Sequence, residues 1–352
     1  MFDGLKTAGA KFDVIGNRKT NNCHGCIFNS IALLDLHSLL LSMLADEINI
    51  RYIGGPTALF QIGGLRFITD PTFDEKNTVY ETEGLKLKKL GNPLIAPQQL
   101  DKMDFVLLTN GHHYANLDHT GKEYLNYVEY VFTTPGAAAV LGSNVVGLNA
   151  WQEVELATKD GRTVILIGIP CEQHPIEAKK GPATGFLLYL QDDPDGAVYI
   201  TGTTLYTDGM KEVASRFNVR LVIPFLGAAL AGSKESPDGT GSQAGSFDSA
   251  GRQASNSDVP DSQSISSDSS GNNTKNSANS DIQQNFSSMT VMDAIKLSVL
   301  FDQAIITPLQ FEGWAHYTEG AAEIQSAFAS AGLMSRLKWP YGFSTNKLVQ
   351  KN

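Results

Sequence analysis

The chain has 352 residues, of which 42% are hydrophobic and 18% are charged, and its net charge is −10. This is the composition of a globular protein long enough to bury a full core. The acidic excess argues against a nucleic-acid phosphate backbone or an anionic membrane as the main partner.

The first 48 residues form an N-terminal extension whose apolar stretch, Ile27 to Leu44, predicts a Leu-rich helix at 30–45. It begins too late for a secretory signal peptide. Asp35 and His37 near its middle would be costly in hydrocarbon. We therefore expect the helix to pack against protein and not to cross a membrane.

The chain has only three cysteines, Cys23, Cys26 and Cys171. So few cysteines favour a reducing compartment, and we expect a cytoplasmic protein. Cys23 and Cys26 have the spacing of half a zinc site, but no second pair follows, so neither a zinc site nor a redox pair is predicted.

Short apolar runs bounded by Gly, Pro and Asp predict the strands. We expect strands at 49–53, 57–62, 65–69, 104–109, 130–133, 162–168, 184–190, 197–201, 220–224 and 303–307, and further helices at 119–128, 208–217, 290–301 and 319–332. Thr318 is the expected N-cap of the last helix. Early strands form hairpins and later ones alternate with helices, which predicts two sheets with helices outside them.

Residues 233–288 are rich in Ser, Asn, Gly and Asp and have almost no large apolar side chains. Such a segment cannot bury enough surface to offset its ordering entropy, so we predict a disordered insert. Ordered sequence resumes at 289. We therefore expect one domain made of 49–232 and 289–340, followed by a tail at 341–352.

Polar side chains gather in the loops that follow five of these strands, where functional sites usually lie. The candidates are Asp70 in the first loop, Asn110, His112, His113 and Asp118 in the second, His174 in the third, Thr203 in the fourth, and Gln310 and His316 in the fifth.

Five sequence runs in these regions resemble the metallo-β-lactamase superfamily of hydrolases. They are YIGGPTAL (52–59), TDPTFD (69–74), NLD (116–118), TTP (133–135) and EGWAHYTEG (312–320). The resemblance covers about 49–230 and 289–340. It implies an α/β fold, the four-layer αβ/βα sandwich, with metal ions at the strand ends between the sheets.

The resemblance also implies a set of metal ligands, most of which this chain lacks. The first histidine of the His-rich motif falls at Asn110, the bridging aspartate at Thr203 and the last histidine at Gln310. His112 and His174 remain. The aspartate and final histidine of the commonest motif fall at Tyr114 and Ala115.

A catalytic zinc needs about three ligands from His, Asp, Glu or Cys, and neutral amide or hydroxyl oxygens bind it poorly. We therefore expect His112 and His174 to be too few to hold zinc or another divalent metal at ordinary availability. The polar replacements predict a pocket in which Asn110, Thr203, Gln310 and the two histidines hydrogen-bond to one another.

Other candidates have both structural and functional interpretations. The resemblance implies that Asp70 holds a metal-binding histidine in place without touching the metal. Asp70 also suits a turn after a strand. Asp118 suits the N-terminus of the following helix. His113 is either a hydrogen-bonded loop residue or a metal contact, and Glu312 and His316 suit the rim of the pocket.

Two functions stay open. The first is a hydrolase-like protein with little or no activity that binds a small molecule in its polar pocket, or a protein partner. The second is an active metal-dependent hydrolase of an ester, lactone, amide or phosphodiester, with a metal recruited through His113 or Asp118. A more remote possibility is a scaffold that acts through its N-terminal helix and its insert.

Overall fold

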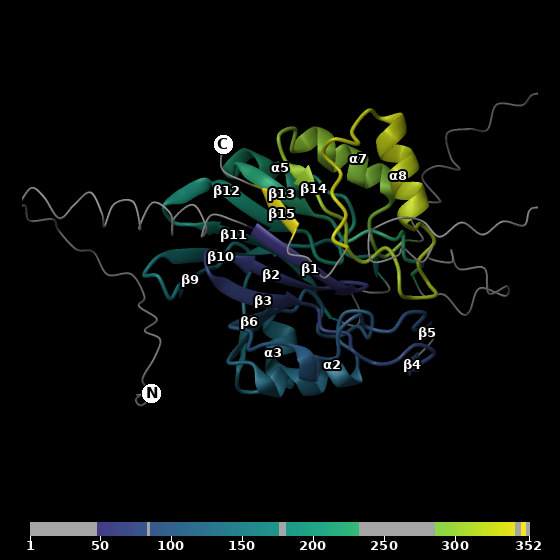
Figure 1. Ribbon diagram of the computed structural model, residues 1–352. Helices are drawn as coiled ribbons and strands as arrows, with labels where there is room; N and C mark the ends of the chain where they lie inside the picture. Colours follow the sequence, from purple (N-terminus) through teal and green to yellow (C-terminus); the bar gives the residue numbers. More distant parts are fainter. Residues whose placement is uncertain (1–47, 83–84, 176–180, 232–285, 342–345, 350–352) are drawn as a thin grey trace, which may run out of the picture.

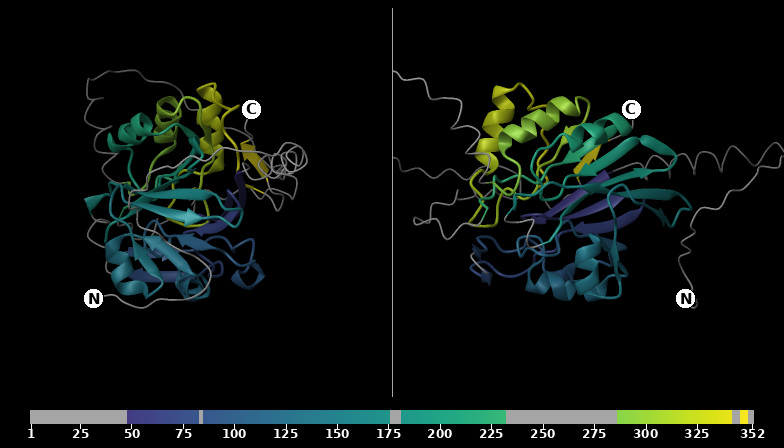
Figure 2. Two further views of the ribbon diagram at one scale, coloured as in Figure 1. Left: turned by 90° about the vertical axis from the view of Figure 1, so that its left-hand side faces the viewer. Right: turned by 180° about the vertical axis from the view of Figure 1, so that it is seen from behind.

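The computed structural model describes residues 48–82, 85–175, 181–231, 286–341 and 346–349. The predicted helix at 30–45 and nearly all of the predicted insert lie outside them. Within them, two large sheets pack face to face, with helices on both outer faces (Figure 1, Figure 2). The predicted four-layer αβ/βα sandwich is confirmed.

The first sheet has seven strands in the order β15-β1-β2-β3-β6-β7-β8. They are β1 (Ile48–Gly54), β2 (Thr57–Ile62), β3 (Leu65–Thr69), β6 (Phe105–Leu107), β7 (Tyr130–Thr133), β8 (Val145–Gly147) and β15 (Asn346–Val349). The pairs from β15 to β3 are antiparallel, whereas β3, β6, β7 and β8 run parallel. The carboxyl ends of β3 and β6 therefore lie at one edge.

The second sheet has six strands in the order β14-β13-β12-β11-β10-β9. They are β9 (Glu153–Ala157), β10 (Thr163–Pro170), β11 (Thr184–Leu190), β12 (Asp193–Ile200), β13 (Val219–Ile223) and β14 (Ile305–Ile306). β12, β13 and β14 run parallel, so the loops after them also share one edge. A separate hairpin, β4 (Val79–Thr82) and β5 (Leu85–Lys88), lies outside both sheets.

Helices α2 (His119–Tyr124) and α3 (Pro135–Leu141) cover the outer face of the first sheet, and α5 (Gly209–Arg216), α7 (Val291–Leu300) and α8 (Ala321–Ser330) cover the second (Figure 1). Two short 3-10 helices, η1 (Pro97–Gln99) and η2 (Leu125–Tyr127), complete the set. None of the described helices has the length and apolar character that a membrane crossing requires.

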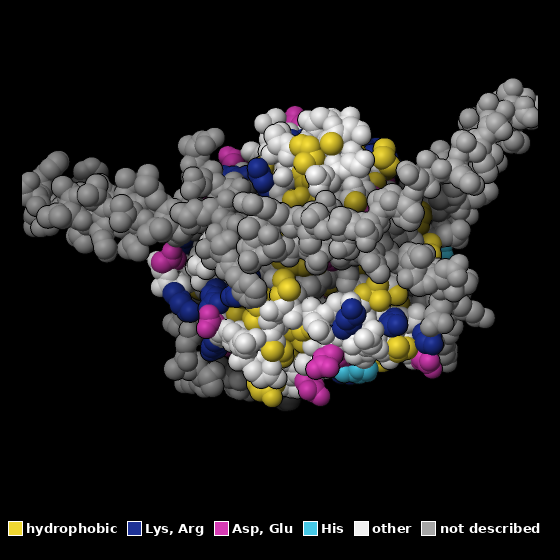
Figure 3. Space-filling model, turned by 45° about the vertical axis from the view of Figure 1, so that its right-hand side comes forward, with side chains coloured by type: hydrophobic (Ala, Val, Ile, Leu, Met, Phe, Trp, Pro, Cys, Tyr) yellow, Lys and Arg dark blue, Asp and Glu magenta, His cyan; other side chains and the backbone are white. Residues whose placement is uncertain are grey.

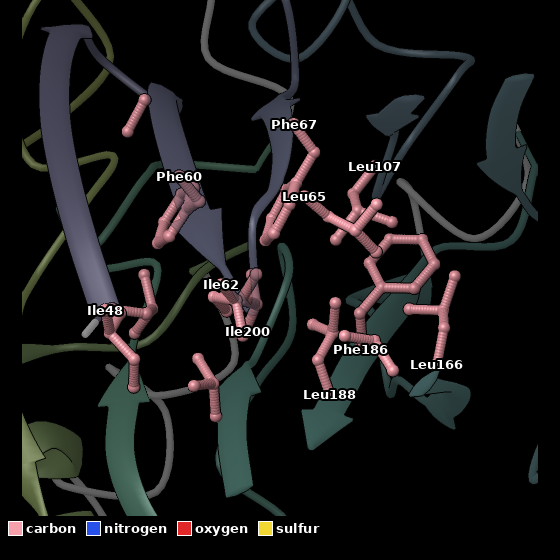
Figure 4. Close-up of a cluster of buried hydrophobic side chains, with 14 of the residues drawn as sticks. Ile48, Phe60, Ile62, Leu65, Phe67, Leu107, Leu166, Phe186, Leu188 and Ile200 are labelled. Carbon is pink, nitrogen blue, oxygen red and sulfur yellow. The ribbon is translucent and has the colours of Figure 1, made fainter. Parts of the chain in front are cut away.

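The main core lies between the two sheets. Side chains from facing strands point toward one another, among them Phe60 and Phe67 from the first sheet and Phe186 and Leu188 from the second (Figure 4). The rings of Phe60 and Phe67 stack at 5.1 Å between centroids. Burying each such side chain contributes roughly 1.5–3 kcal/mol. This packing fixes the strand ends from which the site loops start.

Several predicted boundaries differ from the structure. The last helix begins at Ala321 with Gly320 as its N-cap, because the Glu323 carboxylate accepts the Gly320 N–H, whereas the Thr318 hydroxyl donates to the Ala228 carbonyl. The helix expected over 119–128 ends at Tyr124 and continues as η2.

The folded chain also extends beyond the predicted domain at two places. Phe286 forms a β-bridge with Leu230, and the Ser287 N–H donates to the Ala229 carbonyl at 2.7 Å, so 286–288 belong to the fold and not to the insert. Within the predicted tail, β15 pairs with β1.

Candidate functional site

A cluster of neutral polar side chains surrounds one buried carboxylate where β3, β6, β12 and β14 end. We call Asp70, Thr109, Asn116, Thr203 and Gln310 the central cluster. The Asp70 carboxylate accepts hydrogen bonds from the Thr109 N–H and hydroxyl, both at 2.6 Å, and from the Asn116 amide at 2.9 Å. Burial raises the pKa of Asp70 to about 7, although these hydrogen bonds lower it.

The hydrogen-bond chain continues from the first sheet to the second. The Asn116 amide also donates to the Thr203 hydroxyl at 3.0 Å, and that hydroxyl donates to Gln310 Oε1 at 3.0 Å. Asp70 and Asn116 are fully buried, and Thr203 and Gln310 are nearly so. The structure thus brings together three of the predicted candidates, Asp70, Thr203 and Gln310.

The backbone is strained at two positions of the central cluster. Asp70 has a φ of 33° and Gln310 a φ of 57°, which non-glycine residues seldom adopt. The surroundings fix both conformations, because the Asp70 N–H donates to the Leu107 carbonyl and the Gln310 N–H to the Gly55 carbonyl. Strain of this kind persists mainly at functional sites.

One buried side-chain oxygen of the central cluster, Asn116 Oδ1, makes no hydrogen bond within the described part of the chain. Tyr317 is 3% exposed. Burial raises the pKa of Tyr317, a side-chain hydrogen bond with Gln310 lowers it and the charge of Asp70 raises it, so Tyr317 lies next to the central cluster.

Asn110 and His112 do not join this hydrogen-bond chain. Asn110 Oδ1 accepts the His112 N–H at 3.0 Å, which makes a local turn after β6. The His112 ring packs on Gly181, where an added Cβ would lie 2.1 Å from His112 Cδ2, and Gly136 of α3 lies on the same side. His112 therefore faces α3 and the chain before β11.

His113 faces the loop that contains His316, and the two rings lie 6.0 Å apart. His316 is 7% exposed and packs against Trp314 and Tyr317. His174 lies half-buried in the loop after β10.

Asp118 belongs to a second group of residues, the hairpin cluster, formed by Asp74, Tyr80, Lys89, Asp118 and His119. Its carboxylate caps α2 by accepting the Gly121 N–H, which confirms the structural interpretation of this residue. It also forms a buried ion pair with Lys89 at 2.8 Å. Both oxygens of Asp118 therefore accept hydrogen bonds from the protein itself, Oδ1 from Gly121 and Oδ2 from Lys89 and the Asp74 N–H.

A cavity of about 730 Å³ opens beside the hairpin cluster, lined in part by Asp74, Glu75 and His119. The Asp74 carboxylate accepts hydrogen bonds from the Tyr80 hydroxyl, the Thr120 N–H and hydroxyl, and the His119 N–H. Burial raises the pKa of Asp74, but these bonds outweigh it and bring the pKa to about 2. Its oxygens are thus occupied by the protein itself.

The donor set of the central cluster does not fit the metal ions that the fold family implies. Among the described residues, no three His, Cys, Asp or Glu side chains are grouped so that they could hold a metal ion. Thr203 and Gln310 bind each other, and the amide of Asn116 presents hydrogen atoms to its neighbours. Borderline-soft metals need charged or nitrogen ligands here.

Sequence reasoning missed two members of the central cluster, Thr109 and Asn116. Asn116 appears there only as part of the NLD run. Its position seven residues after Thr109 gave no sign that its amide would bridge Asp70 and Thr203, because this contact depends on the turn at 110–115.

One face of the molecule carries charges of both signs. On the face drawn in Figure 3, Lys and Arg side chains are interspersed with Asp and Glu side chains.

Comparisons with known proteins identify the fold. A scan against protein-family models and a search of curated proteins both find no match. Among solved structures, an isothiocyanate hydrolase from Delia radicum gut bacteria matches with a TM-score of 0.58 and 16% identity, over 84% of this chain and 98% of that one. A possible metal-dependent hydrolase from Veillonella parvula matches with a TM-score of 0.59 and 15% identity, over 86% of this chain and 100% of that one. At these identities the likeness shows the metallo-β-lactamase-like fold alone.

Proposed function

We propose that this chain, which has the metallo-β-lactamase-like fold, binds a small polar ligand in the central cluster and has little or no metal-dependent hydrolase activity. One observation supports this most directly. The hydrogen-bond chain from Asp70 through Asn116 and Thr203 to Gln310 passes through two positions where the resemblance implies a bridging aspartate and a histidine.

The physical reason is the chemistry of these side chains. Two dications need anionic ligands to offset their charge, and a water becomes a nucleophile near neutral pH only when a metal lowers its pKa. Neutral Thr and Gln oxygens supply neither charge nor strong coordination. The same side chains suit recognition of a polar group, because they offer donors and acceptors in a buried site.

A second candidate function is hydrolysis with a non-standard metal site. The observation that favours it is the proximity of His113 and His316, whose rings lie 6.0 Å apart. Both solved neighbours are described as hydrolases, one of isothiocyanates. A metal held by these two histidines would still need a third ligand.

Elemental analysis and a hydrolase screen test the proposal together. Purified protein is measured for zinc, manganese and iron, as isolated and after incubation with each metal, and is assayed on ester, lactone, amide, phosphodiester and isothiocyanate substrates. We expect well under one metal per chain and no activity that a chelator removes.

A stoichiometric metal that a chelator removes together with an activity would overturn the proposal. The variants His113→Ala and His316→Ala then identify the site, because both should lose the metal if the second candidate is correct. Lys122→Ala, on the exposed side of α2, is the control that should keep it.

A further inference from the structure

The side chains of the central cluster have little contact with solvent, since none of its five residues is more than 9% exposed. They come from both halves of the sandwich. Asp70, Thr109 and Asn116 follow strands of the first sheet, and Thr203 and Gln310 follow strands of the second. A ligand that hydrogen-bonds to this cluster therefore reaches it where the two halves meet, and the residues that cover this junction have to move.

A layer of buried side chains lies beside the cluster at this junction. Its members are Tyr80, Leu87, Ala115, Ala229, Trp314 and Tyr317. The layer borders the central cluster directly, because Tyr317 has a side-chain hydrogen bond with Gln310. Ala115 also precedes Asn116 in the chain.

The β4–β5 hairpin and the chain before α8 lie next to each other in this layer (Figure 1). The rings of Tyr80 on β4 and Trp314 before α8 are 5.4 Å apart. Residues 88–90 and 313–315 also share a backbone contact, which we call the seam. It holds two hydrogen bonds, of 2.8 and 3.0 Å, that flank an isolated β-bridge between Lys89 and Trp314. Among the described strands, the hairpin pairs with neither large sheet.

The two sides of the seam are anchored to different halves of the molecule. On one side, Lys89 forms its buried ion pair with Asp118, the N-cap of α2. On the other side, the Thr318 N–H donates to the Gly227 carbonyl in the chain after β13. A buried ion pair is costly to break, whereas each backbone hydrogen bond contributes little net stability. Movement between the halves should therefore part the seam first.

We propose that the seam opens to admit a ligand to the central cluster and closes over it once the ligand is bound. This inference rests on the proposed function, because it supplies the route by which the ligand enters. In the open form, residues 313–315 move away from β5 while the hairpin stays on α2. The structure described above is the closed form.

A disulfide across the seam tests the proposal. Lys88 is exposed and Ala315 is half-buried, and the Ala315 N–H donates to the Lys88 carbonyl at 3.0 Å. Directly opposed residues of an antiparallel pair have Cα atoms about 5.5 Å apart, which a disulfide spans. Lys88→Cys and Ala315→Cys are therefore combined in the full-length chain, with Cys23→Ser and Cys26→Ser to prevent other pairings. The same chain with Lys88→Cys alone is the control.

Hydrogen exchange without ligand is compared between the oxidised and reduced proteins. Peptides 105–118 and 201–206 report on the central cluster and contain neither new cysteine. The peptide 186–190 of β11 reports on global unfolding. We expect the disulfide to slow exchange at least about tenfold in the two site peptides, and by a smaller factor in β11, because it closes a local opening route. No slowing, or the same factor in all three peptides, would refute the proposal.

The unmodified protein provides a second measurement that does not depend on forming the disulfide. Local opening exposes less surface than global unfolding, so low urea should accelerate exchange of the site peptides less steeply than exchange of β11. Equal urea dependence would mean that the cluster opens only when the whole domain unfolds, which contradicts an opening seam. Metal content decides the proposed function separately, so failure of this inference is distinguishable from failure of that function.

Discussion

The carboxyl group of Asp70 links the central cluster to the stability of the whole fold. Burial raises its pKa to about 7 in the folded protein, from 3.8 in the unfolded chain. Between pH 3.8 and about pH 7, the Asp70 carboxyl group is therefore protonated in the folded state and ionised in the unfolded state.

This shift predicts a loss of stability as pH rises. The contribution of Asp70 is fully present below about pH 4 and is lost as pH increases to about 7, with a slope of up to about 1.4 kcal/mol per pH unit. Urea unfolding of the protein without divalent metal should show this slope between pH 5 and 7. The slope should shrink in Asp70→Asn. We subtract the free energy of unfolding of Asp70→Asn from that of the wild type at each pH. If this difference rises with pH, Asp70 is ionised over the whole range.

The two adjacent histidines show what a local sequence does not determine. Sequence reasoning assigned the surviving ligand position to His112. In the structure, the turn made by Asn110 directs His112 toward α3 and Gly181, and it is His113 that faces His316. Which of two neighbouring side chains enters a site depends on the backbone of a single turn.

At the scale of elements, the hairpin cluster connects β5, α2 and the loop before α8. The side chains of Lys89 and Asp118 are 5% and 0% exposed, and the Lys89 ammonium lies over the Trp314 ring at 5.6 Å. Burial lowers the pKa of Lys89, and Asp118 opposes that shift. The pair thus holds two buried charges that compensate each other.

Replacing Lys89 with Met should be strongly destabilising, because it leaves Asp118 buried and uncompensated. We expect a loss of about 3–5 kcal/mol in urea unfolding. Lys211→Met, which breaks the exposed pair with Asp208, is the matched control and should leave stability nearly unchanged. Similar results for the two variants would mean that water reaches the Lys89 pair.

Helix α2 should not tolerate a side chain at Gly121. A Cβ there would lie 1.8 Å from the Pro71 carbonyl oxygen, so the helix would have to move away from the loop after β3. We expect Gly121→Ala to lower the Tm by at least several degrees, since overpacking typically costs about 1–3 kcal/mol.

Gly136→Ala in α3 is the control for this variant. Its nearest neighbour would be 3.6 Å from the new Cβ, and alanine favours the helix by roughly 0.5–1 kcal/mol. If Gly121→Ala melts at the same temperature as Gly136→Ala, the contact of α2 with Pro71 is looser than described.

The elements that sequence predicted and those it missed differ in composition. β10 and β11 are long runs of Val, Ile, Leu and Phe buried between layers, and both were predicted. β9 alternates acidic and apolar residues at a sheet edge, β8 has only three residues, and α3 begins within a Thr-Thr-Pro-Gly run typical of a turn. Their pairing and packing partners stabilise these elements more than their own sequences do.

At the scale of the whole molecule, the two ends of the predicted insert meet. The β-bridge between Leu230 and Phe286 and the bond from the Ser287 N–H to the Ala229 carbonyl place these ends side by side. The predicted insert therefore leaves and re-enters the domain at two paired, neighbouring positions.

Deleting residues 236–283 should leave the fold intact. Loop closure depends weakly on length, by about 0.6 kcal/mol for each doubling, so a short linker between the paired ends should slightly favour folding. We expect a Tm within a few degrees of the full-length protein. A control that also removes Phe286 and Ser287 should melt lower. A large loss of Tm in the shorter deletion would show that the segment packs against the domain.

The chain that leads into this segment, Gly227 to Leu230, contacts the loop that holds His316. The Leu230 N–H donates to the His316 carbonyl at 3.1 Å, and the Thr318 N–H donates to the Gly227 carbonyl at 2.8 Å. A tensile load applied to the chain after Leu230 would therefore reach the loop that holds His316 through these backbone hydrogen bonds. The chain at the start of the predicted insert is thus mechanically coupled to the loop that carries His316 and Tyr317.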